Sequence, residues 1–317
     1  MSASTPTPSP PTPTPPHEGE GIAAALPPAG RAGERSEPGW GALRLSSTVL
    51  GARVGPIEHA IDARWLMAYS AALGESDTRY FETGGPSGPA AHPLFAVAYE
   101  WPLAIALRER VIGEAIAPFS VHATHDLMIH RPPRAGDRLS TTAHVVDVRP
   151  VKAGSLVVVR LDTVDGAGAP VTTTHYGSIY RGVDCDGTSA PPVPSPAPGA
   201  VRWEEQVAIS GQLAHVYTEC ARIWNPIHTD VAVARAAGLP GLILHGTATL
   251  ALAVSRVVNH DLGGDPARVR GLAVRFTGMV PMPSTVTVRG YEDNASEIPF
   301  DAVNTAGSVL GRGVVKR

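Results

Sequence analysis

The chain has 317 residues, of which 43% are hydrophobic and 17% charged, with a formal net charge of -3 at pH 7. This composition is typical of a globular protein with a substantial core and room for two domains. The slight negative charge, with no Lys/Arg block beside aromatic residues, argues against nucleic acid as a partner. Cys185 and Cys220 have neither CxxC nor metal-ligand spacing, so we expect no disulfide scaffold and no bound metal.

Residues 1–40 are predicted to form a disordered tail, because they hold 10 of the 31 prolines and few aromatic or β-branched side chains. The tail lacks the basic and apolar regions of a secretory signal. The most apolar later stretch, "GLILHGTATLALAV" at 241–254, is too short to span a bilayer. We therefore expect no membrane partner and a cytoplasmic location.

A second proline-rich tract, "DGTSAPPVPSPAPGA" at 186–200, separates two segments of globular composition. Such a tract is typical of an extended linker between domains. We therefore predict an N-terminal unit at 41–183, a linker at 184–200 and a C-terminal unit at 201–317.

The two predicted units are related in sequence. Residues 60–77 align without a gap with residues 208–225, at an offset of 148 that pairs Tyr69 with Tyr217. A later stretch aligns at an offset of 147, and "LDTVDGAGAPV" and "FDAVNTAGSVL" repeat one strand-turn-strand phrase with a Gly in each turn. An internal repeat of this length predicts two copies of one structural unit.

Each copy follows the same order of predicted elements: a short strand, a small-residue helix, a loop, a longer helix and three or four alternating strands. Segments such as "STTAHVVDV", "SLVVVRLDTV" and "PVTTTHYGSIY" carry the strand pattern. This order predicts an α+β fold with an antiparallel sheet wrapped on a helix. The long helix of the second copy begins near His245 and is apolar nearly all round, which predicts a buried helix.

The segment "NPIHTDVAVARAAGLPGLILHGTATLALA" resembles the (R)-specific enoyl-CoA hydratase motif of MaoC-like dehydratases. The resemblance covers roughly residues 41–317. It implies a tandem (double) hot-dog fold, in which each half is an antiparallel sheet around a central helix. In the N-terminal half the likeness is architectural only, which implies a degenerate hot dog.

The family motif Asp-x-Asn-Pro-x-His falls on residues 223–228, and the resemblance assigns catalysis to His228, Asn225 and the backbone of Gly246. Ile223 stands where the family has its catalytic Asp. A serine that supports this Asp in the family corresponds to Val254. Because loss of one partner alone would strand a buried polar group, the two aliphatic residues predict a pocket wall rebuilt as apolar surface.

The resemblance also places further side chains near the substrate. Ile223, Val254 and Trp224 are expected to line it. Arg222 either meets a CoA phosphate or lies at the subunit surface, and the sequence leaves both interpretations open.

The chemistry of these residues suits hydration of a thioester. An imidazole such as that of His228, with a reference pKa of about 6.5, can activate water near neutral pH. The N–H of Gly246, at the start of a buried helix, suits a developing oxyanion. Loss of the acid at Ile223 is expected to cost on the order of 10² to 10⁴ in rate.

Three carboxylates are weighed as substitutes for the lost acid. Glu219 and Asp230 are close to the motif in sequence. Glu75 corresponds to Ile223 at the repeat offset of 148, although its simplest interpretation is a solvated helix-end acid.

The leading hypothesis is an acyl-CoA hydro-lyase that hydrates 2-enoyl-CoA to 3-hydroxyacyl-CoA, or dehydrates it, with CoA as part of the substrate and no separate cofactor. The alternative is a catalytically degenerate hot-dog protein that binds acyl-CoA or completes a dehydratase complex. Acyl-CoA thioester hydrolysis is a weaker alternative. The halves are expected to pack as a pseudo-dimer, which leaves open a homodimer or a hetero-oligomer with other hot-dog subunits.

Overall fold

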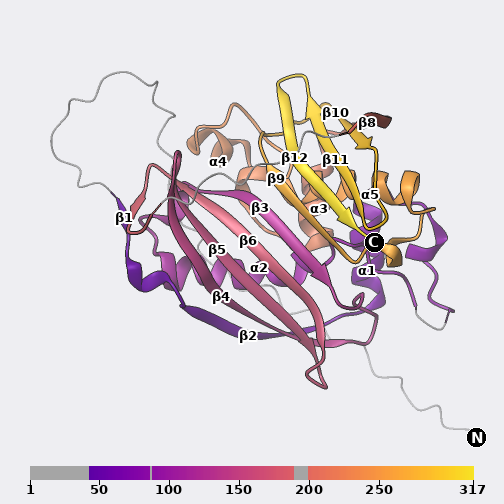
Figure 1. Ribbon diagram of the computed structural model, residues 1–317, viewed down its shortest axis with the longest axis horizontal. Helices are drawn as coiled ribbons and strands as arrows, with labels where there is room; N and C mark the ends of the chain where they lie inside the picture. The colour runs from indigo at the N-terminus through magenta and orange to yellow at the C-terminus, as the bar shows by residue number, and fades with distance from the viewer. Residues whose placement is uncertain (1–42, 86–87, 189–198) are drawn as a thin grey trace, which may run out of the picture.

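The structure is a computed structural model that describes residues 43–85, 88–188 and 199–317 (Figure 1). The predicted tail and most of the predicted linker lie outside these residues. The strands are β1 (Arg44–Leu45), β2 (Arg53–Ala60), β3 (Ser120–Ile129), β4 (Arg138–Val151), β5 (Gly154–Asp165), β6 (Pro170–Arg181), β7 (Asp184–Cys185), β8 (Val201–Ile209), β9 (Gly271–Phe276), β10 (Ser284–Tyr291), β11 (Glu297–Asn304) and β12 (Gly307–Lys316). The α-helices are α1 (Ala63–Ala72), α2 (Ala96–Leu107), α3 (Leu213–Ala221), α4 (Val231–Ala236) and α5 (Gly246–Asp261).

One ten-stranded sheet runs through both halves of the molecule in the order β2-β4-β5-β6-β3-β9-β12-β11-β10-β8. The order of the first five strands repeats, reversed, in the last five. The halves meet where β3 pairs antiparallel with β9, from Thr124 opposite Arg275 to Met128 opposite Gly271. The predicted tandem hot-dog architecture is therefore confirmed, with the two half-sheets fused edge to edge.

The strands alternate as the sequence pattern predicts. Along β5, Val157, Val159 and Leu161 are buried, whereas Val158 and Arg160 between them are partly exposed. The repeated strand-turn-strand phrase forms the turns after β5 and β11, where Gly168 and Gly307 adopt positive φ. A glycine is needed there because other L-residues rarely adopt this conformation.

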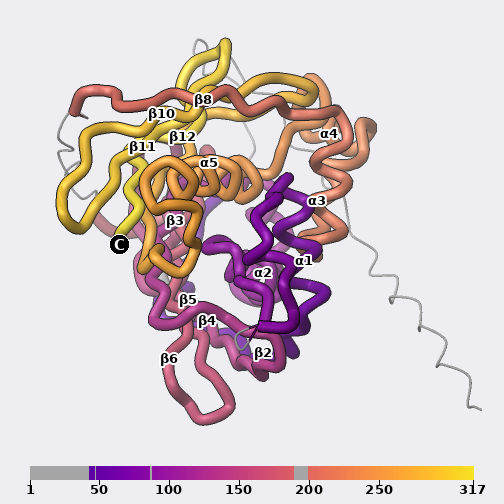
Figure 2. Tube along the Cα trace, turned by 90° about the vertical axis from the view of Figure 1, so that its right-hand side faces the viewer, coloured from indigo at the N-terminus to yellow at the C-terminus, as the bar shows by residue number. Residues whose placement is uncertain are grey.

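Each half-sheet covers one long helix, α2 in the N-terminal half and α5 in the C-terminal half (Figure 2). The predicted burial of α5 is confirmed, since every residue from Ala248 to Ser255 is buried. The larger apolar core contains side chains of both halves, whereas a smaller one lies between α2 and the N-terminal strands. Burial of this shared surface is the main favourable term that holds the halves together.

Helices α1 and α3, the paired small-residue helices of the repeat, pack against each other (Figure 2). The hydroxyls of Tyr69 and Tyr217 lie 3.3 Å apart at this contact, and the Tyr69 hydroxyl also donates to the carbonyl of Leu94 at 3.1 Å. These tyrosines are the pair that the sequence offset of 148 predicts. They therefore mark the pseudo-twofold axis that relates the halves.

Two short strands add a detail to the predicted organisation. β7 lies within the tract predicted as linker, and it pairs in parallel with β1 at the start of the N-terminal half. None of the described helices is long and apolar enough to cross a bilayer.

Replacing Tyr69 with Phe removes the hydroxyl at the pseudo-twofold axis and one of two donors to the buried carbonyl of Leu94, which keeps the N–H of Val97 at 3.2 Å. We expect the free energy of unfolding in urea to fall by about 1–2 kcal/mol. A matched control is Val216→Ala on the exposed side of α3, which should change it by less than about 0.5 kcal/mol. Equal stability of Tyr69→Phe and the native chain would show that the hydroxyl contact adds nothing to the packing of the halves.

Candidate active site

The loop after α3 is shaped by its backbone. Arg222 ends α3 in the left-handed conformation, with φ 59°, and the N–H of Ile223 closes the turn on the carbonyl of Thr218 at 3.1 Å. The side chain of Asn225 then accepts from the N–H of Ile227 at 3.4 Å and begins the short helical turn Pro226–His228. This loop brings His228 back toward the start of α5.

His228 is buried, with 9% of its surface exposed, and its Nδ1 lies 2.9 Å from the carbonyl oxygen of Ile243. Because a carbonyl can only accept, Nδ1 carries the proton and Nε2 keeps its lone pair. The carbonyl is fixed because Ile243 forms a bridge with Pro281. Burial lowers the pKa of His228 to about 4, so the imidazole is neutral near pH 7.

His245 packs directly on this imidazole. The two rings are stacked with their centroids 3.8 Å apart, and His245 also contacts the ring of Tyr217. Its Nε2 lies 3.2 Å from the hydroxyl of Thr218. Burial, and then the neighbouring His228, lower the pKa of His245 to about 2. His245 therefore acts as a neutral wall that positions His228.

Gly246 follows His245 and is the first residue of α5. Among the described residues, none accepts a hydrogen bond from its N–H, which points along the positive end of the helix dipole. Phe276 covers this glycine so closely that an added Cβ would lie 3.2 Å from its ring. His245 thus stacks on the imidazole of His228 and directly precedes Gly246 in the chain. Through His245, the structure brings the base and the N–H at the start of α5 together.

The remaining predicted site residues separate into core and surface. Ile223 and Val254 are buried in the shared apolar core, 3% and 0% exposed. Trp224 is 58% exposed and lies at the surface. Arg222 stacks its guanidinium on the ring of Trp65 in the other half, 4.0 Å from the ring centroid.

Neither nearby carboxylate replaces the acid lost at position 223. Glu219 lies on the exposed side of α3. Asp230 is exposed and caps α4, accepting from the N–H groups of Ala232 and Val233. Both carboxylates are therefore exposed, whereas His228 is buried.

Glu75 is a different case, and its interpretation as a solvated helix-end acid is wrong. Its side chain is only 7% exposed, because Ser255 of α5 covers it and donates a hydrogen bond to its carboxylate. His92 lies behind Ser255: its Nδ1 accepts from the N–H of Leu94, so its Nε2 donates to the Ser255 hydroxyl at 3.1 Å. Burial raises the pKa of Glu75. The pairing joins residues 180 positions apart, which no local pattern could indicate.

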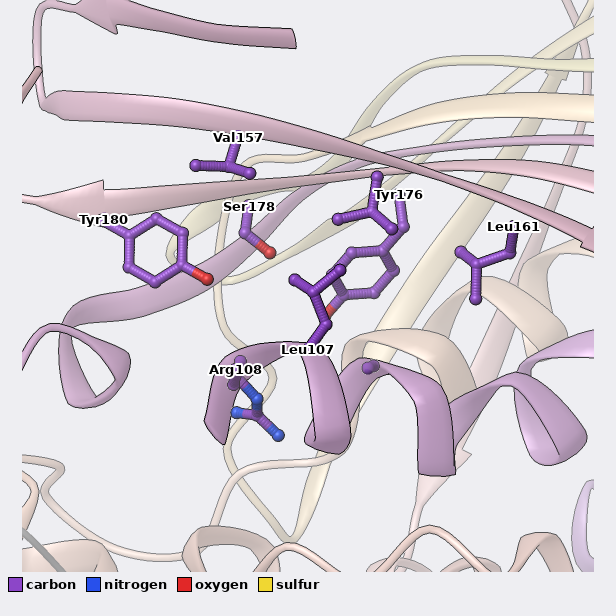
Figure 3. Close-up of a pocket in the computed structure, with 9 residues that line it drawn as sticks. Leu107, Arg108, Val157, Leu161, Tyr176, Ser178 and Tyr180 are labelled. Carbon is purple, nitrogen blue, oxygen red and sulfur yellow. The ribbon is translucent and has the colours of Figure 1, made fainter. Parts of the chain in front are cut away.

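A small cavity of about 20 Å³, with room for about one water molecule, lies between the end of α2 and strands β5 and β6 (Figure 3). Tyr176 on its wall stacks on His122, with centroids 4.0 Å apart. His122 in turn lies 4.3 Å from Phe276, which covers Gly246. Packed rings therefore connect the cavity wall in one half with Gly246 in the other.

Sequence reasoning missed Phe276 and His122. Phe276 occupies a position of the repeat alignment, but that alignment says nothing of what its ring covers. Within the described ranges, no three His, Cys, Asp or Glu side chains are grouped to hold a metal ion.

Both halves of the chain are similar to known proteins. Residues 196–308 match the MaoC like domain family, and residues 48–174 match the FAS1-like dehydratase domain region. Over 279 residues the chain is 24% identical to the probable enoyl-CoA hydratase 2 of Dictyostelium discoideum, covering 84% of this chain and 94% of that relative.

Two solved structures share the fold. A MaoC-like dehydratase from Phytophthora capsici superposes with a TM-score of 0.74 at 21% identity, covering 84% of this chain and 95% of that one. A Mycobacterium tuberculosis protein with a double hot-dog fold gives a TM-score of 0.54 at 19% identity, with the same coverage of 84% and 95%.

His228→Gln keeps a donor for the carbonyl of Ile243 but cannot titrate. Because the folded pKa of about 4 lies below the value of about 6.5 in the unfolded chain, native stability from neutral His228 is complete above pH 6.5 and falls as the pH drops toward 4. Between pH 7 and 5, the variant should therefore lose about 2 kcal/mol less unfolding free energy than the native chain.

The measurement is urea denaturation at a series of pH values. The control is His130→Gln at an exposed position, which should keep the native pH slope. Identical slopes for His228→Gln and the native chain would contradict a buried, neutral His228.

Proposed function

We propose that this chain, which carries a MaoC-like domain in its C-terminal half and a FAS1-like dehydratase region in its N-terminal half, is an acyl-CoA hydro-lyase. It adds water across the C2–C3 double bond of a 2-enoyl-CoA or removes it from the 3-hydroxyacyl-CoA. The observation that carries the proposal is the neutral imidazole of His228 stacked on His245, the residue that precedes Gly246 and its N–H at the start of α5. The name of its Dictyostelium relative, probable enoyl-CoA hydratase 2, supports the same reaction.

In the first step, Nε2 of His228 takes a proton from water as the water oxygen bonds to C3. Electrons of the C2–C3 double bond move toward the thioester carbonyl, whose oxygen becomes negative. The N–H of Gly246 donates to this oxygen, and the dipole of α5 stabilises the charge because it develops at the N-terminus of that helix. The tautomer fixed by Ile243 leaves Nε2 free for this task.

In the second step, C2 takes a proton and the carbonyl re-forms. With Ile223 in place of an acid, the imidazolium of His228 is the group that returns the proton it accepted. The balance is one water added and no net proton lost. One group doing both transfers is slower than a cooperating pair, so we expect activity reduced by about 10² to 10⁴ relative to a site with both groups.

CoA is part of the substrate, and the proposal requires no other cofactor.

Hydration of crotonyl-CoA tests the base. The native chain should lower the absorbance of the enoyl thioester, and His228→Gln should reduce kcat/KM by at least about 10²-fold. Because an imidazolium cannot take a proton, native kcat/KM should stay level from pH 8 to 5 and fall only near the His228 pKa of about 4.

An inactive native chain would favour the alternative of a catalytically degenerate binding protein. That alternative predicts that saturated acyl-CoA still raises the melting temperature although no double bond is consumed. Release of free thiol would favour thioester hydrolysis instead.

Restoring the polar pair tests what its loss costs. In Ile223→Asp/Val254→Ser the hydroxyl can satisfy the new carboxylate in the buried site, and a second acid/base group shares the proton transfers. We expect kcat to rise by on the order of 10² or more over the native chain.

The single variant Ile223→Asp is the matched control. It places an unpaired carboxylate in the core, so it should gain less activity and lose more stability than the double variant. A double variant that folds yet gains nothing would refute the idea that the missing pair limits the reaction.

A further inference from the structure

An open groove of about 390 Å³ lies between the end of α1, strand β8, the start of α3 and helix α5. Figure 2 shows how these four elements are arranged. The volume is in the range of small-molecule binding sites. The lining residues are 71–74, 205–208, Ser210, Leu213, Leu252 and Arg256. The groove is therefore separate from the site around His228 and Gly246.

The corresponding place in the N-terminal half is filled by aromatic rings. Ring contacts with centroid distances between 5.1 and 6.0 Å join four side chains in a row: His59, Tyr99, Phe95 and Trp65. Such distances are typical of packed aromatic pairs. The guanidinium of Arg222 covers the last ring of the row, 4.0 Å from its centroid. The N-terminal half thus supplies its own rings and its own cation at this place.

The C-terminal half has aliphatic residues at all four corresponding positions. The repeat offset of 148 gives the counterparts on β8 and α3, and the aligned steps His92–Pro93 and His245–Gly246 give those on α5. In the order of the ring row, the counterparts are Val207, Leu252, Ala248 and Leu213. All of them except Ala248 line the groove. The groove therefore lies where the other half has its rings.

The position of the covering cation differs as well. The counterpart of Arg222 at the offset of 148 is Gly74, which lies just after α1 with φ 75° and lines the groove. Among the described residues, no atom lies within 4 Å of a Cβ built on Gly74. The groove is therefore uncovered at the point where Arg222 covers Trp65 in the other half.

A guanidinium lines this groove from α5 instead. Arg256 has 23% of its side chain exposed, and its Nη1 donates to the carboxylate of Glu205 at 2.8 Å. The other oxygen of Glu205 lies 2.8 Å from Nε2 of His260. These contacts hold the guanidinium at the wall of the groove, beside the aliphatic side chains. A cation in such surroundings is a binding partner for the face of an aromatic ring.

The charges at the wall favour an uncharged ligand. An anionic ligand would meet Glu205, and a cationic ligand would meet Arg256, so either charge is repelled by one partner of the pair. The apolar part of the wall, which includes Leu213 and Leu252, suits a flat hydrocarbon surface. An alkyl chain would gain the same apolar contact but has no π face for the guanidinium.

We propose that this groove is a second binding site, which takes a flat, uncharged, electron-rich aromatic group of about the size of an indole. The group lies against Leu213 and Leu252 with its face toward Arg256. The site is additional to the hydro-lyase function, because it shares none of the residues assigned to that reaction.

Saturation-transfer NMR titration of the native chain with indole tests the site. Octan-1-ol, which has the same number of non-hydrogen atoms, is the matched aliphatic probe. Indole should bind with a Kd of about 1 mM or tighter, and octan-1-ol at least about tenfold more weakly, because it lacks a π face and loses rotational freedom. No binding of indole up to about 10 mM, or equal binding of octan-1-ol, would overturn the proposal.

Filling the groove from within the chain tests its location. Leu213→Trp places an indole where the other half has Trp65, so the affinity for added indole should fall by about tenfold or more while the melting temperature stays at or above the native value. The matched control is Val216→Trp, on the exposed side of α3, which should keep the native affinity. Native affinity in a folded Leu213→Trp variant would refute the groove as the site.

Removing the cation tests the contact with the ring. Arg256→Met keeps an unbranched side chain but has no charge, so the Kd of indole should rise by about two- to fivefold while that of octan-1-ol stays the same. The control is Arg235→Met, at an exposed position of α4. The ratio of the two affinities comes from one preparation, and a native ratio in Arg256→Met would refute the contact.

The binding measurement does not depend on catalysis. A native chain that hydrates crotonyl-CoA but binds no indole would refute the second site and leave the hydro-lyase function standing. A native chain that binds indole in the groove but hydrates nothing would support the second site and contradict the hydro-lyase function.

Discussion

The antiparallel pairing of β3 with β9 is the constraint on which the rest of the structure depends. It fuses two half-sheets into one, and it fixes the register in which their inner faces meet. His125 and Val274 become neighbours through this pairing, and His122 comes to lie against Phe276. The inner faces of the two halves therefore share one continuous set of packed rings.

The pseudo-twofold axis also shows how the two related sites have diverged. Near α5, the helix-end amide of Gly246 remains but the acid position holds Ile223. In the N-terminal half, Glu75 keeps a carboxylate, yet Pro93 follows His92 where Gly246 follows His245, and a proline has no N–H to offer an oxyanion. The N-terminal half thus has a carboxylate but no N–H at this position, whereas the C-terminal half has the N–H of Gly246 but Ile223 at the position of the carboxylate.

The sequence predicts the fold because the fold repeats one unit and because its helices and strands produce periodic patterns in short stretches of sequence. The offset that pairs Tyr69 with Tyr217, the alternation along the strands and the all-round apolar α5 each reflect a periodicity that sheets and helices impose. Contacts between segments that are distant in sequence produce no such periodic pattern. Ser255 on Glu75 and Phe276 on Gly246 follow from register and packing, which a single sequence does not encode in any one stretch.

The aliphatic pair and the buried carboxylate near it are linked by α5. Val254 and Ser255 are adjacent on this helix, so their side chains point about 100° apart, toward different halves. Val254 joins Ile223 in the shared core, whereas Ser255 supports Glu75. Helix α5 therefore presents an apolar side chain to Ile223 in its own half. It presents a hydroxyl to Glu75 in the other half. Because Ile223 and Val254 are both buried and both aliphatic, neither position leaves a buried polar group without a partner.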